Sequence, residues 1–450
     1  GISWKAETLD GTEVGGEESI SVAVRESAGG VGEDTADGLT GGSPYVCGDP
    51  LRPGNQAIFF GRDETLAQIK RQIARTGNVV LLEGNRRSGK SSVLHHLEGL
   101  NTIPGWLSVY CSLQGAEGSR ERVGIPTEGV FRELAKSIAG GLTQLDVQVA
   151  LPDGSILQSG KRLGIAKACR QGIGTEAPFD DLRDYVEMAL GVLESRGLGL
   201  AILLDEFDKL QEGIDNGVTS PQVPENIRFL VQNYPRVSAV LTGSRRLKRL
   251  REEYWSALFG LGTRIPLTSL DAEAARDLVI RPVRSLLTYS DEAVERVIHL
   301  TARQPFLVQC LCSKVYDSAA QLGRRSVTRE FVDEASRGLV EDNEHFAFLW
   351  DFLARESRRL LLALCHREAE GPDPLTIGLM EELLSGFGLE IEEKTLIDDL
   401  EFLIELELLE RAERAGGKSY LPALPLMGYW IRRHQDFTVL VKRAAMGLGG

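Results

Sequence analysis

A glycine followed by four residues and then Gly-Lys-Ser is the most informative spacing in the sequence. It runs from Gly84 to Ser91 within the stretch EGNRRSGKSSVL. Glycines let the backbone curl so that successive N–H groups point inward at phosphate oxygens. The lysine of such a loop adds a point charge for the phosphates, and the following hydroxyl can ligate Mg²⁺. The spacing therefore predicts a loop that binds nucleotide phosphates.

The segments on either side of this loop have the patterns that the motif needs. Residues 78–84 form the continuous apolar run of a buried parallel strand, and residues 91–100 read as a helix whose positive dipole end would face the phosphates. A glycine-rich turn before a helix is the simpler alternative, and the order strand, loop, helix argues against it. The residues assigned to the site are Gly84, Asn85, Arg86, Arg87, Ser88, Gly89, Lys90, Ser91 and Ser92, with Ser91 as a Mg²⁺ ligand.

An acidic pair ends a second apolar run, LAILLDEFDKL. Asp205 would hold Mg²⁺ through water, and Glu206 is placed to orient and deprotonate an attacking water. A strand that merely ends in acidic surface residues is the alternative, and the phosphate loop makes it improbable. Asp208 is better explained as a residue that starts a helix.

A third polar strand end follows in VSAVLTGSRRLKRLR. Thr242 at its tip can sense a γ-phosphate, and Arg245 could stabilise charge there. The alternative is a solvated helix face. We favour that alternative for Lys248, Arg249 and Arg251, and leave both open for Arg245.

Apolar runs and helical patterns alternate along the first half of the chain. Because such alternation produces parallel sheets, the sequence predicts an α/β, doubly wound P-loop domain. Residues 146–177 hold five glycines and one proline and are expected to be an irregular insertion. The further strands are expected at 106–113, 200–205, 237–244 and 263–267, and the helices at 127–145, 180–196 and 224–233.

The remaining patterns divide the chain into five segments. Residues 1–43 hold ten Gly, nine acidic and two basic residues, which indicates an acidic linker, although Glu18–Glu26 alternates like the last strand of an upstream β-domain. Three helical patterns followed by two extended runs around Gly416 and Gly417 predict a winged helix. The segments are 1–43 (linker), 44–270 (P-loop ATPase domain), 271–341 (helical lid), 342–437 (winged-helix domain) and 438–450 (tail).

Composition limits the class of protein. A protein whose main task is to coat nucleic acid needs positive charge for the phosphates, and the net charge of −14 argues against that task. The six cysteines lack zinc-site spacing and are interpreted as buried thiols, so we expect no metal other than Mg²⁺. We see no leader peptide and no run of about 18 apolar residues, and expect a cytoplasmic protein without a membrane span.

The order of motifs resembles that of STAND-type signalling ATPases, relatives of the AAA+ and origin-recognition group that are common in bacterial multidomain proteins. The resemblance covers about residues 44–436. It rests on FFGRDETLAQI, GNRRSGKSSVL, VYCSLQG, AILLDEFDKL, VLTGSRRL, LVIRPV and LTARQPFLVQCLC.

The resemblance implies an adenine nucleotide and a switch. Phe59, Phe60, Gly61 and Arg62 match the box whose backbone borders the adenine, and Pro305 matches a lid proline that packs over the nucleotide. The family usually shows Gly two residues before that proline, where this chain has Arg303 instead; the lid contact could therefore differ, or Arg303 could itself reach the phosphates. Family members are closed with ADP and self-assemble with ATP, often in defence or stress signalling through an attached effector.

Three hypotheses follow. The first is a slow, Mg²⁺-dependent STAND-type ATPase switch that binds ATP or ADP, self-associates in the ATP state and controls an effector or sensor. The second is an origin-recognition-like AAA+ DNA-binding ATPase. Against it, residues 390–410 of the recognition helix hold nine acidic residues and one basic residue, which argues against nucleic acid as a partner. The third is a scaffold that binds nucleotide without hydrolysis, which the intact Glu206 argues against.

Overall fold

The computed structural model divides the chain into two compact units, Gly1–Thr40 and Gly41–Gly450. None of the helices in the described part of the chain is long and apolar enough to span a bilayer. The residues that the structure describes are 2–7, 13–18, 41–75, 78–116, 118, 123–145, 147–157, 162–243, 262–369, 375–414 and 417–448.

The first unit contains a β-hairpin. Strand β1 (Ile2–Glu7) pairs antiparallel with β2 (Glu13–Glu18), with Ile2 opposite Glu18. This hairpin occupies part of a stretch expected to be linker. The alternation Ile2-Ser3-Trp4-Lys5 was the overlooked strand signal. Apart from Glu18, the strand expected at 18–26 lies outside the described residues.

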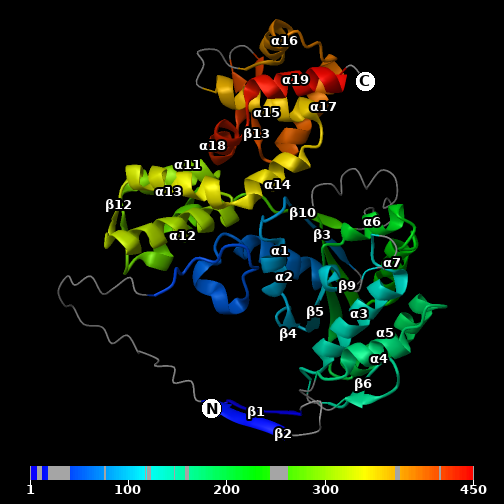
Figure 1. The fold of residues 1–450 in the computed structure, drawn as a ribbon. Helices are drawn as coiled ribbons and strands as arrows, with labels where there is room; N and C mark the ends of the chain where they lie inside the picture. The colour runs from blue at the N-terminus through cyan, green and yellow to red at the C-terminus, as the bar shows by residue number, and fades with distance from the viewer. Residues whose placement is uncertain are drawn as a thin grey trace. The chain divides into compact units, whose positions relative to one another are not determined.

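A six-stranded sheet lies among helices α1 to α7 in the second unit (Figure 1). Its strand order is β10-β3-β9-β8-β5-β4, and all neighbours are parallel except β4 and β5. The strands are β3 (Val79–Glu83), β4 (Gly99–Leu100), β5 (Trp106–Ser112), β8 (Gly199–Asp205), β9 (Val237–Gly243) and β10 (Thr263–Pro266).

Helices cover both faces of this sheet. One face packs against α1 (Asp63–Ile73) and α2 (Lys90–His95). The other packs against α3 (Thr127–Leu142), α4 (Ile165–Gly172), α5 (Pro178–Glu194), α6 (Lys209–Asp215) and α7 (Val223–Asn233). Short 3-10 turns lie at η2 (Pro53–Ile58), η3 (Leu113–Gly115) and η4 (Arg281–Val283).

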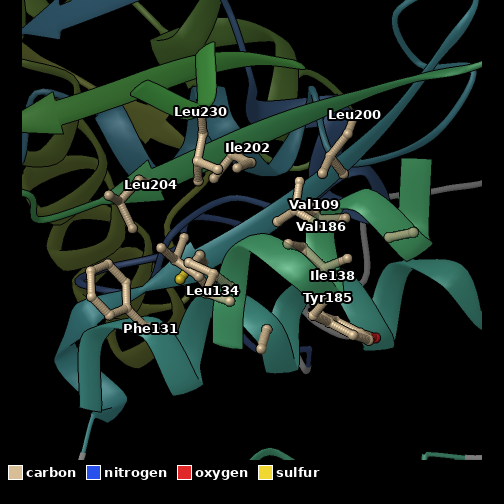
Figure 2. Packing of buried hydrophobic residues seen from close by; sticks show 14 of the residues in the cluster. Val109, Phe131, Leu134, Ile138, Tyr185, Val186, Leu200, Ile202, Leu204 and Leu230 are labelled. Atoms are coloured by element: carbon tan, nitrogen blue, oxygen red, sulfur yellow. The ribbon is translucent and has the colours of Figure 1, made fainter. Parts of the chain in front are cut away.

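The period-two alternation of strand β8 explains the two cores. Leu200, Ile202 and Leu204 face α3, α5 and α7, as Figure 2 shows, whereas Ala201 and Leu203 belong to the cluster on the α1–α2 face. Every residue of β8 and β9 is buried, as expected for central parallel strands. The predicted doubly wound parallel sheet is confirmed.

Two local predictions were wrong. The helix expected over 91–100 ends at His95, because Gly99 adopts a left-handed φ of +118° and begins the short strand β4. The insertion 146–177 is not irregular where the structure describes it. It contains strands β6 (Val149–Ala150) and β7 (Ile156–Leu157), joined by a turn at Asp153-Gly154, and then helix α4.

Four longer helices and a short parallel pair of strands make up residues 271–342, so this region is helical as predicted, and its role as a lid stays a prediction. Asp271, Ser290 and Thr328 cap three of these helices through their side chains. The elements are α10 (Ala272–Ile280), β11 (Thr288–Tyr289), α11 (Asp291–Thr301), α12 (Pro305–Leu322), β12 (Ser326–Val327) and α13 (Arg329–Asp342).

The winged helix consists of three helices and a hairpin, with further helices around it. Residues 438–450 were expected to be a tail, yet they are helical to Leu448 and pack on α15 through Leu440 and Ala444. The exact domain boundaries stay predictions. The elements are α14 (Glu344–Phe352), α15 (Glu356–Glu368), α16 (Ile377–Gly386), α17 (Glu393–Glu405), β13 (Leu409–Arg414), β14 (Gly417–Pro422), α18 (Pro425–His434) and α19 (Phe437–Leu448).

The packing of the insertion depends on Gly172 at the end of α4. A Cβ there would lie 2.2 Å from the carbonyl carbon of Pro152, which belongs to the β6–β7 hairpin. We expect Gly172→Ala to lower the free energy of unfolding by about 1–3 kcal/mol in denaturant titrations, because the hairpin backbone has to move. Gly191→Ala on α5 is the control, since a Cβ there meets nothing within 4 Å. Equal stability of the two variants would contradict the packing described here.

Candidate phosphate-binding site

The loop between β3 and α2 has the backbone that its glycines predict. A Cβ on Gly84 would lie 2.6 Å from both the Leu267 carbonyl oxygen and the Ser88 Oγ, so no larger residue fits. Gly89 has a φ of +95°, which favours glycine. Arg87 also adopts a left-handed φ, +66°, which is strained for a residue with a side chain and holds the tip of the loop in a fixed turn.

The Lys90 ammonium group hydrogen bonds to the backbone of the loop. Its Nζ donates to the carbonyl oxygens of Gly84 at 3.0 Å and Asn85 at 2.9 Å. Burial lowers the pKa of Lys90, and the nearby carboxylates of Asp208, Asp205 and Glu206 act in the opposite direction. The ammonium group therefore sits between loop carbonyls and an acidic strand end.

The Arg62 guanidinium links the loop to the segment after β10 through hydrogen bonds. Its Nη2 donates to the Ser88 carbonyl at 3.2 Å and to the Thr268 carbonyl at 2.8 Å. Burial lowers the pKa of Arg62 to about 10, so the guanidinium stays charged at neutral pH. Arg62 lines the cavity described below, and its contacts are with loop backbone.

The acidic pair ends β8 beside the loop. Asp205 is buried, and its Oδ2 accepts a 2.8 Å hydrogen bond from the Tyr110 hydroxyl. Its Oδ1 accepts from the Thr242 hydroxyl and, at 3.0 Å, from the Glu206 N–H. These three donors fix the orientation of the carboxylate. Glu206 has a left-handed φ of +55°, and its carboxylate pairs with Lys209 at 2.7 Å.

A cavity of about 1360 Å³ opens in front of the loop and the acidic pair. Its walls come from the loop, from Gln114 in η3, from the end of β8, from the start of α12 and from helices α14, α15 and α17. The lining residues used below are Arg86, Arg87, Lys90, Ser91, Asp205, Glu206, Phe306, His345 and Phe348.

The two arginines of the loop reach aromatic rings on the opposite wall. The guanidinium carbon of Arg86 lies 4.1 Å from the ring centroid of Phe348 on α14, and that of Arg87 lies 3.9 Å from the ring centroid of Phe306 on α12. Phe306 in turn makes an edge contact with His345, 5.1 Å between centroids. The loop, α12 and α14 are thus joined by two cation–π contacts.

Two polar side-chain atoms of the loop are buried without a hydrogen-bond partner among the described residues. They are Asn85 Nδ2 and Ser88 Oγ. Buried polar groups of this kind call for a partner that the protein itself does not provide. Oxygen acceptors such as those of a phosphate would satisfy Asn85, so the residues present fit a phosphate-bearing ligand.

The structure brings together most of the residues assigned to the site. Glycines Gly61 and Gly84 are not among the lining residues; Gly61 instead lets α10 approach, since a Cβ there would lie 2.6 Å from Ala274 Cβ. Arg303 is exposed and does not line the cavity, although it has a left-handed φ of +58° like its neighbour Ala302. The assigned residues that line the cavity are Phe60, Arg62, Asn85, Arg86, Arg87, Ser88, Gly89, Lys90, Ser91, Ser92, Asp205, Glu206 and Pro305.

Three assignments need further comment. Arg245 lies outside the described residues, as do Lys248, Arg249 and Arg251. The Ser92 hydroxyl accepts a 2.9 Å hydrogen bond from the Leu51 N–H, so it anchors the chain segment before α1. Asp208 precedes α6, as expected for a residue that starts a helix, but its side chain forms no cap hydrogen bond.

Sequence reasoning missed several residues of the site. Tyr110 could have been found, since β5 neighbours β8 in the sheet and Ser112 pairs with Asp205 in register. Phe306, His345 and Phe348 have no signal in the sequence, because only the packing of α12 and α14 against the loop brings them to the cavity.

Similar solved structures establish the fold. The Walker-type ATPase PABY2304 of Pyrococcus abyssi is 18% identical, with a TM-score of 0.58 over 85% of this chain and 98% of its own. The ORC2 protein of Aeropyrum pernix, solved in ADPNP–ADP complexes, is 14% identical, with a TM-score of 0.52 over 90% and 96%. No protein-family model and no curated protein matches the sequence. The chain therefore has the fold of a P-loop ATPase with a helical C-terminal region.

A third structure is more distant. The ORC1 protein of Aeropyrum pernix in complex with DNA is 18% identical, with a TM-score of 0.40 over 87% of this chain and 94% of its own. A likeness this low argues neither for nor against DNA binding here, so the expectation that nucleic acid is not a partner gains no support. The narrower assignment to STAND-type proteins is likewise not supported by these neighbours.

His345 makes the stability of the folded chain sensitive to acid. Burial, followed by the charges of Arg87 and Arg86, lowers its pKa to about 3 in the folded chain, against about 6.5 when unfolded. The stability contributed by neutral His345 is full above pH 6.5 and is lost as the pH falls toward 3, because only the unfolded chain takes up the proton.

Between pH 7 and pH 5 the free energy of unfolding should decrease in the wild type, because His345 is protonated only in the unfolded chain. In His345→Gln we expect this decrease to be smaller by about 2 kcal/mol, measured by denaturant titration. His434→Gln, which changes an exposed histidine, should follow the wild type. The same pH dependence in all three proteins would show that His345 is not shielded in this way.

Proposed function

We propose that this chain binds ATP and ADP with Mg²⁺ at the 84–91 loop, hydrolyses ATP slowly, and uses the nucleotide state to control its conformation and self-assembly, as a switch of the STAND type. The observation that carries the proposal is the pair of cation–π contacts across the cavity, from Arg86 to Phe348 and from Arg87 to Phe306. They connect the loop that would hold the phosphates directly to α12 and α14.

The strength of these contacts suits a switch. A cation–π contact contributes about 0.5–2 kcal/mol, so the two together are of the order of a coupling free energy between sites, about 1–3 kcal/mol. A phosphate oxygen attracts a guanidinium more strongly than a ring does, through charge-assisted hydrogen bonds. The γ-phosphate of ATP would therefore draw Arg86 and Arg87 from their rings and release α12 and α14.

The site also has the groups for hydrolysis. Ser91 and Asp205 offer the oxygen ligands that Mg²⁺ prefers, and the ion when bound would neutralise phosphate charge. Lys90 would bind phosphate oxygens, and Glu206 would take the proton of the attacking water. The Glu206–Lys209 ion pair is more than one-third exposed on both sides and so is easily broken. Arg245 stays a proposal as a stabiliser of developing charge.

A second candidate function is that of an origin-recognition-like DNA-binding ATPase. One observation favours it: Arg296, Arg337, Arg432 and Arg433 line a second cavity of about 600 Å³ between α11, α13 and α18. Two of these arginines are already paired, Arg296 with Asp333 and Arg433 with Glu341. ATPase activity that rises with duplex DNA, and loses that rise steeply with salt, would favour this function over the switch.

Hydrolysis is tested by Glu206→Gln. We expect the rate of ATP hydrolysis to fall by about 10²–10⁴-fold, while binding of a fluorescent ATP analogue persists, because only the base is removed. Glu212→Gln on α6 is the control, since Glu212 is exposed and does not line the cavity. Nucleotide that binds the wild type and is never hydrolysed would instead indicate a non-enzymatic scaffold.

The switch is tested by Phe348→Leu. Removing the ring that holds Arg86 should let ATP with Mg²⁺ change the particle mass, measured by light scattering, at about two- to tenfold lower ATP concentration. Phe229→Leu on α7 is a matched control, because Phe348 and Phe229 are 41% and 39% exposed. A mass that stays the same with ADP and with ATP in every variant would refute self-assembly as the output of the switch.

A further inference from the structure

The cavity of about 600 Å³ lies where helices α11, α13 and α18 pack against one another (Figure 1). Its volume falls within the range of about 300–1,000 Å³ that is typical of small-molecule sites. Four arginines and two carboxylates line it, so positive charge exceeds negative charge by two. The charged lining residues are Arg296, Asp333, Arg337, Glu341, Arg432 and Arg433.

Two ion pairs join the three helices around this cavity. Arg296 Nε donates to Asp333 Oδ1 at 2.6 Å, and Arg296 Nη2 donates to the Tyr429 hydroxyl at 2.8 Å. This one guanidinium of α11 therefore contacts both α13 and α18. Arg433 Nη2 of α18 lies 3.2 Å from Glu341 Oε1 of α13. The side chains of Arg296 and Arg433 are 18% and 68% exposed, so Arg296 lies at the inner end of the cavity.

The other two arginines of the cavity have no ion-pair partner in the described part of the chain. Asp333 and Glu341 stand four residues before and four residues after Arg337 on α13, the positions at which a helix commonly pairs an arginine with a carboxylate. Both carboxylates are instead engaged in the ion pairs to α11 and α18. The guanidinium groups of Arg337 and Arg432 are therefore left available to a ligand.

The type of cation indicates the chemistry of that ligand. All four cations are arginines, whose planar fork of donors binds two phosphate oxygens at once, whereas a lysine ammonium acts as a point charge. Like charges around one cavity repel one another, and the described lining residues provide only two carboxylates to offset four guanidinium groups. An anion with at least two negative charges would remove this imbalance.

Other polar groups in the chain do not form a comparable site. Among the described residues, no group of three or more His, Cys, Asp or Glu side chains could hold a metal ion. The interpretation of all six cysteines as buried was wrong for Cys47, which is exposed, whereas the other five are buried. A single exposed thiol does not define a binding site.

We propose that the cavity between α11, α13 and α18 binds a free small molecule that carries two or more phosphate groups, and that this ligand holds α18 against α11 and α13. The inference goes beyond the proposed function, because this cavity shares no lining residue with the cavity at the 84–91 loop.

Duplex DNA is the less suitable occupant of this cavity. A protein that binds a duplex backbone presents a stripe or patch of cations to successive phosphates. Here the arginines come from three helices and line one cavity, with the carboxylates of Asp333 and Glu341 between them. This arrangement suits a compact anion, and duplex DNA is therefore one of the compounds to be compared with it.

The test is isothermal titration calorimetry of the full chain with inorganic pyrophosphate, without Mg²⁺. Arg337→Gln should weaken binding about tenfold, because it removes an unpaired guanidinium. Glu341→Gln should strengthen binding about two- to fivefold, because it releases Arg433 from its ion pair. Arg324→Gln is the matched control, since Arg324 is exposed between α12 and β12 and does not line the cavity.

The variants separate this site from the phosphate loop. Pyrophosphate bound at residues 84–91 would be unaffected by all three substitutions, so the outcome does not depend on the proposed function. Arg337 and Glu341 are exposed, so neither substitution should affect folding. In hydrogen–deuterium exchange, peptides covering α18, residues 425–434, should exchange more slowly with pyrophosphate in the wild type and remain unchanged in Arg337→Gln.

Four results would overturn the inference. One is the absence of pyrophosphate binding to the wild type, and another is equal affinity of the wild type and Arg337→Gln. The third is citrate that binds as tightly as pyrophosphate, since the site would then not select phosphate. The fourth is a short DNA duplex, or a vesicle of phosphatidylcholine and a phosphoinositide, that binds through Arg337 while pyrophosphate does not. The ligand would then be a nucleic acid or a lipid surface.

Discussion

The ammonium group of Lys90 is the interaction on which the rest of the site depends. Burial of a cation is costly unless carbonyl oxygens and carboxylates surround it. Here the loop carbonyls of Gly84 and Asn85 accept its hydrogen bonds, and Asp205, Glu206 and Asp208 provide opposite charge. Satisfying Lys90 therefore curls the loop and requires the end of β8 to lie next to it.

The same demand explains the support around the loop. Asp205 keeps one orientation because three donors hold it: the Tyr110 hydroxyl on β5, the Thr242 hydroxyl on β9 and the Glu206 N–H directly after β8. On the other side Arg62 ties Ser88 to Thr268, which follows β10. The sheet order β10-β3-β9-β8-β5 places β10 and β9 on either side of β3, with β8 and β5 beyond β9, and because these strands are parallel their carboxyl ends lie at the same edge as the loop.

Arg86 and Arg87 connect the phosphate loop to α14 and α12, the helices that the proposed switch would release. They occupy the variable positions of the loop motif, which the fold leaves free to be any residue. In this chain both are cations, and both find an aromatic face across the cavity. A ligand with phosphates would compete for those cations, which is why we interpret the arginines as the coupling element rather than as further phosphate ligands alone.

The features that depend on a few neighbouring residues could be predicted from the sequence. The loop spacing, the apolar strands and the acidic strand end all follow from rules of a few residues, so the sheet, its helices and the placement of Lys90, Asp205 and Glu206 could be predicted. The β6–β7 hairpin was missed because glycines were interpreted as irregular structure, although Asp153-Gly154 is a turn signal. The partners Phe306 and Phe348 could not be predicted, because their contacts join segments far apart in the sequence.

Hydrogen–deuterium exchange of the full chain, without nucleotide, with ADP, and with ATP and Mg²⁺, tests the central claim most directly. The account predicts slower exchange in peptides covering residues 84–91 with either nucleotide, because the loop amides bind phosphate. It also predicts faster exchange in peptides covering α14, residues 344–352, with ATP and Mg²⁺ but not with ADP, because Arg86 leaves Phe348 only when ATP is bound. Unchanged exchange in 84–91 would contradict nucleotide binding, and equal exchange of α14 with ADP and ATP would contradict the coupling.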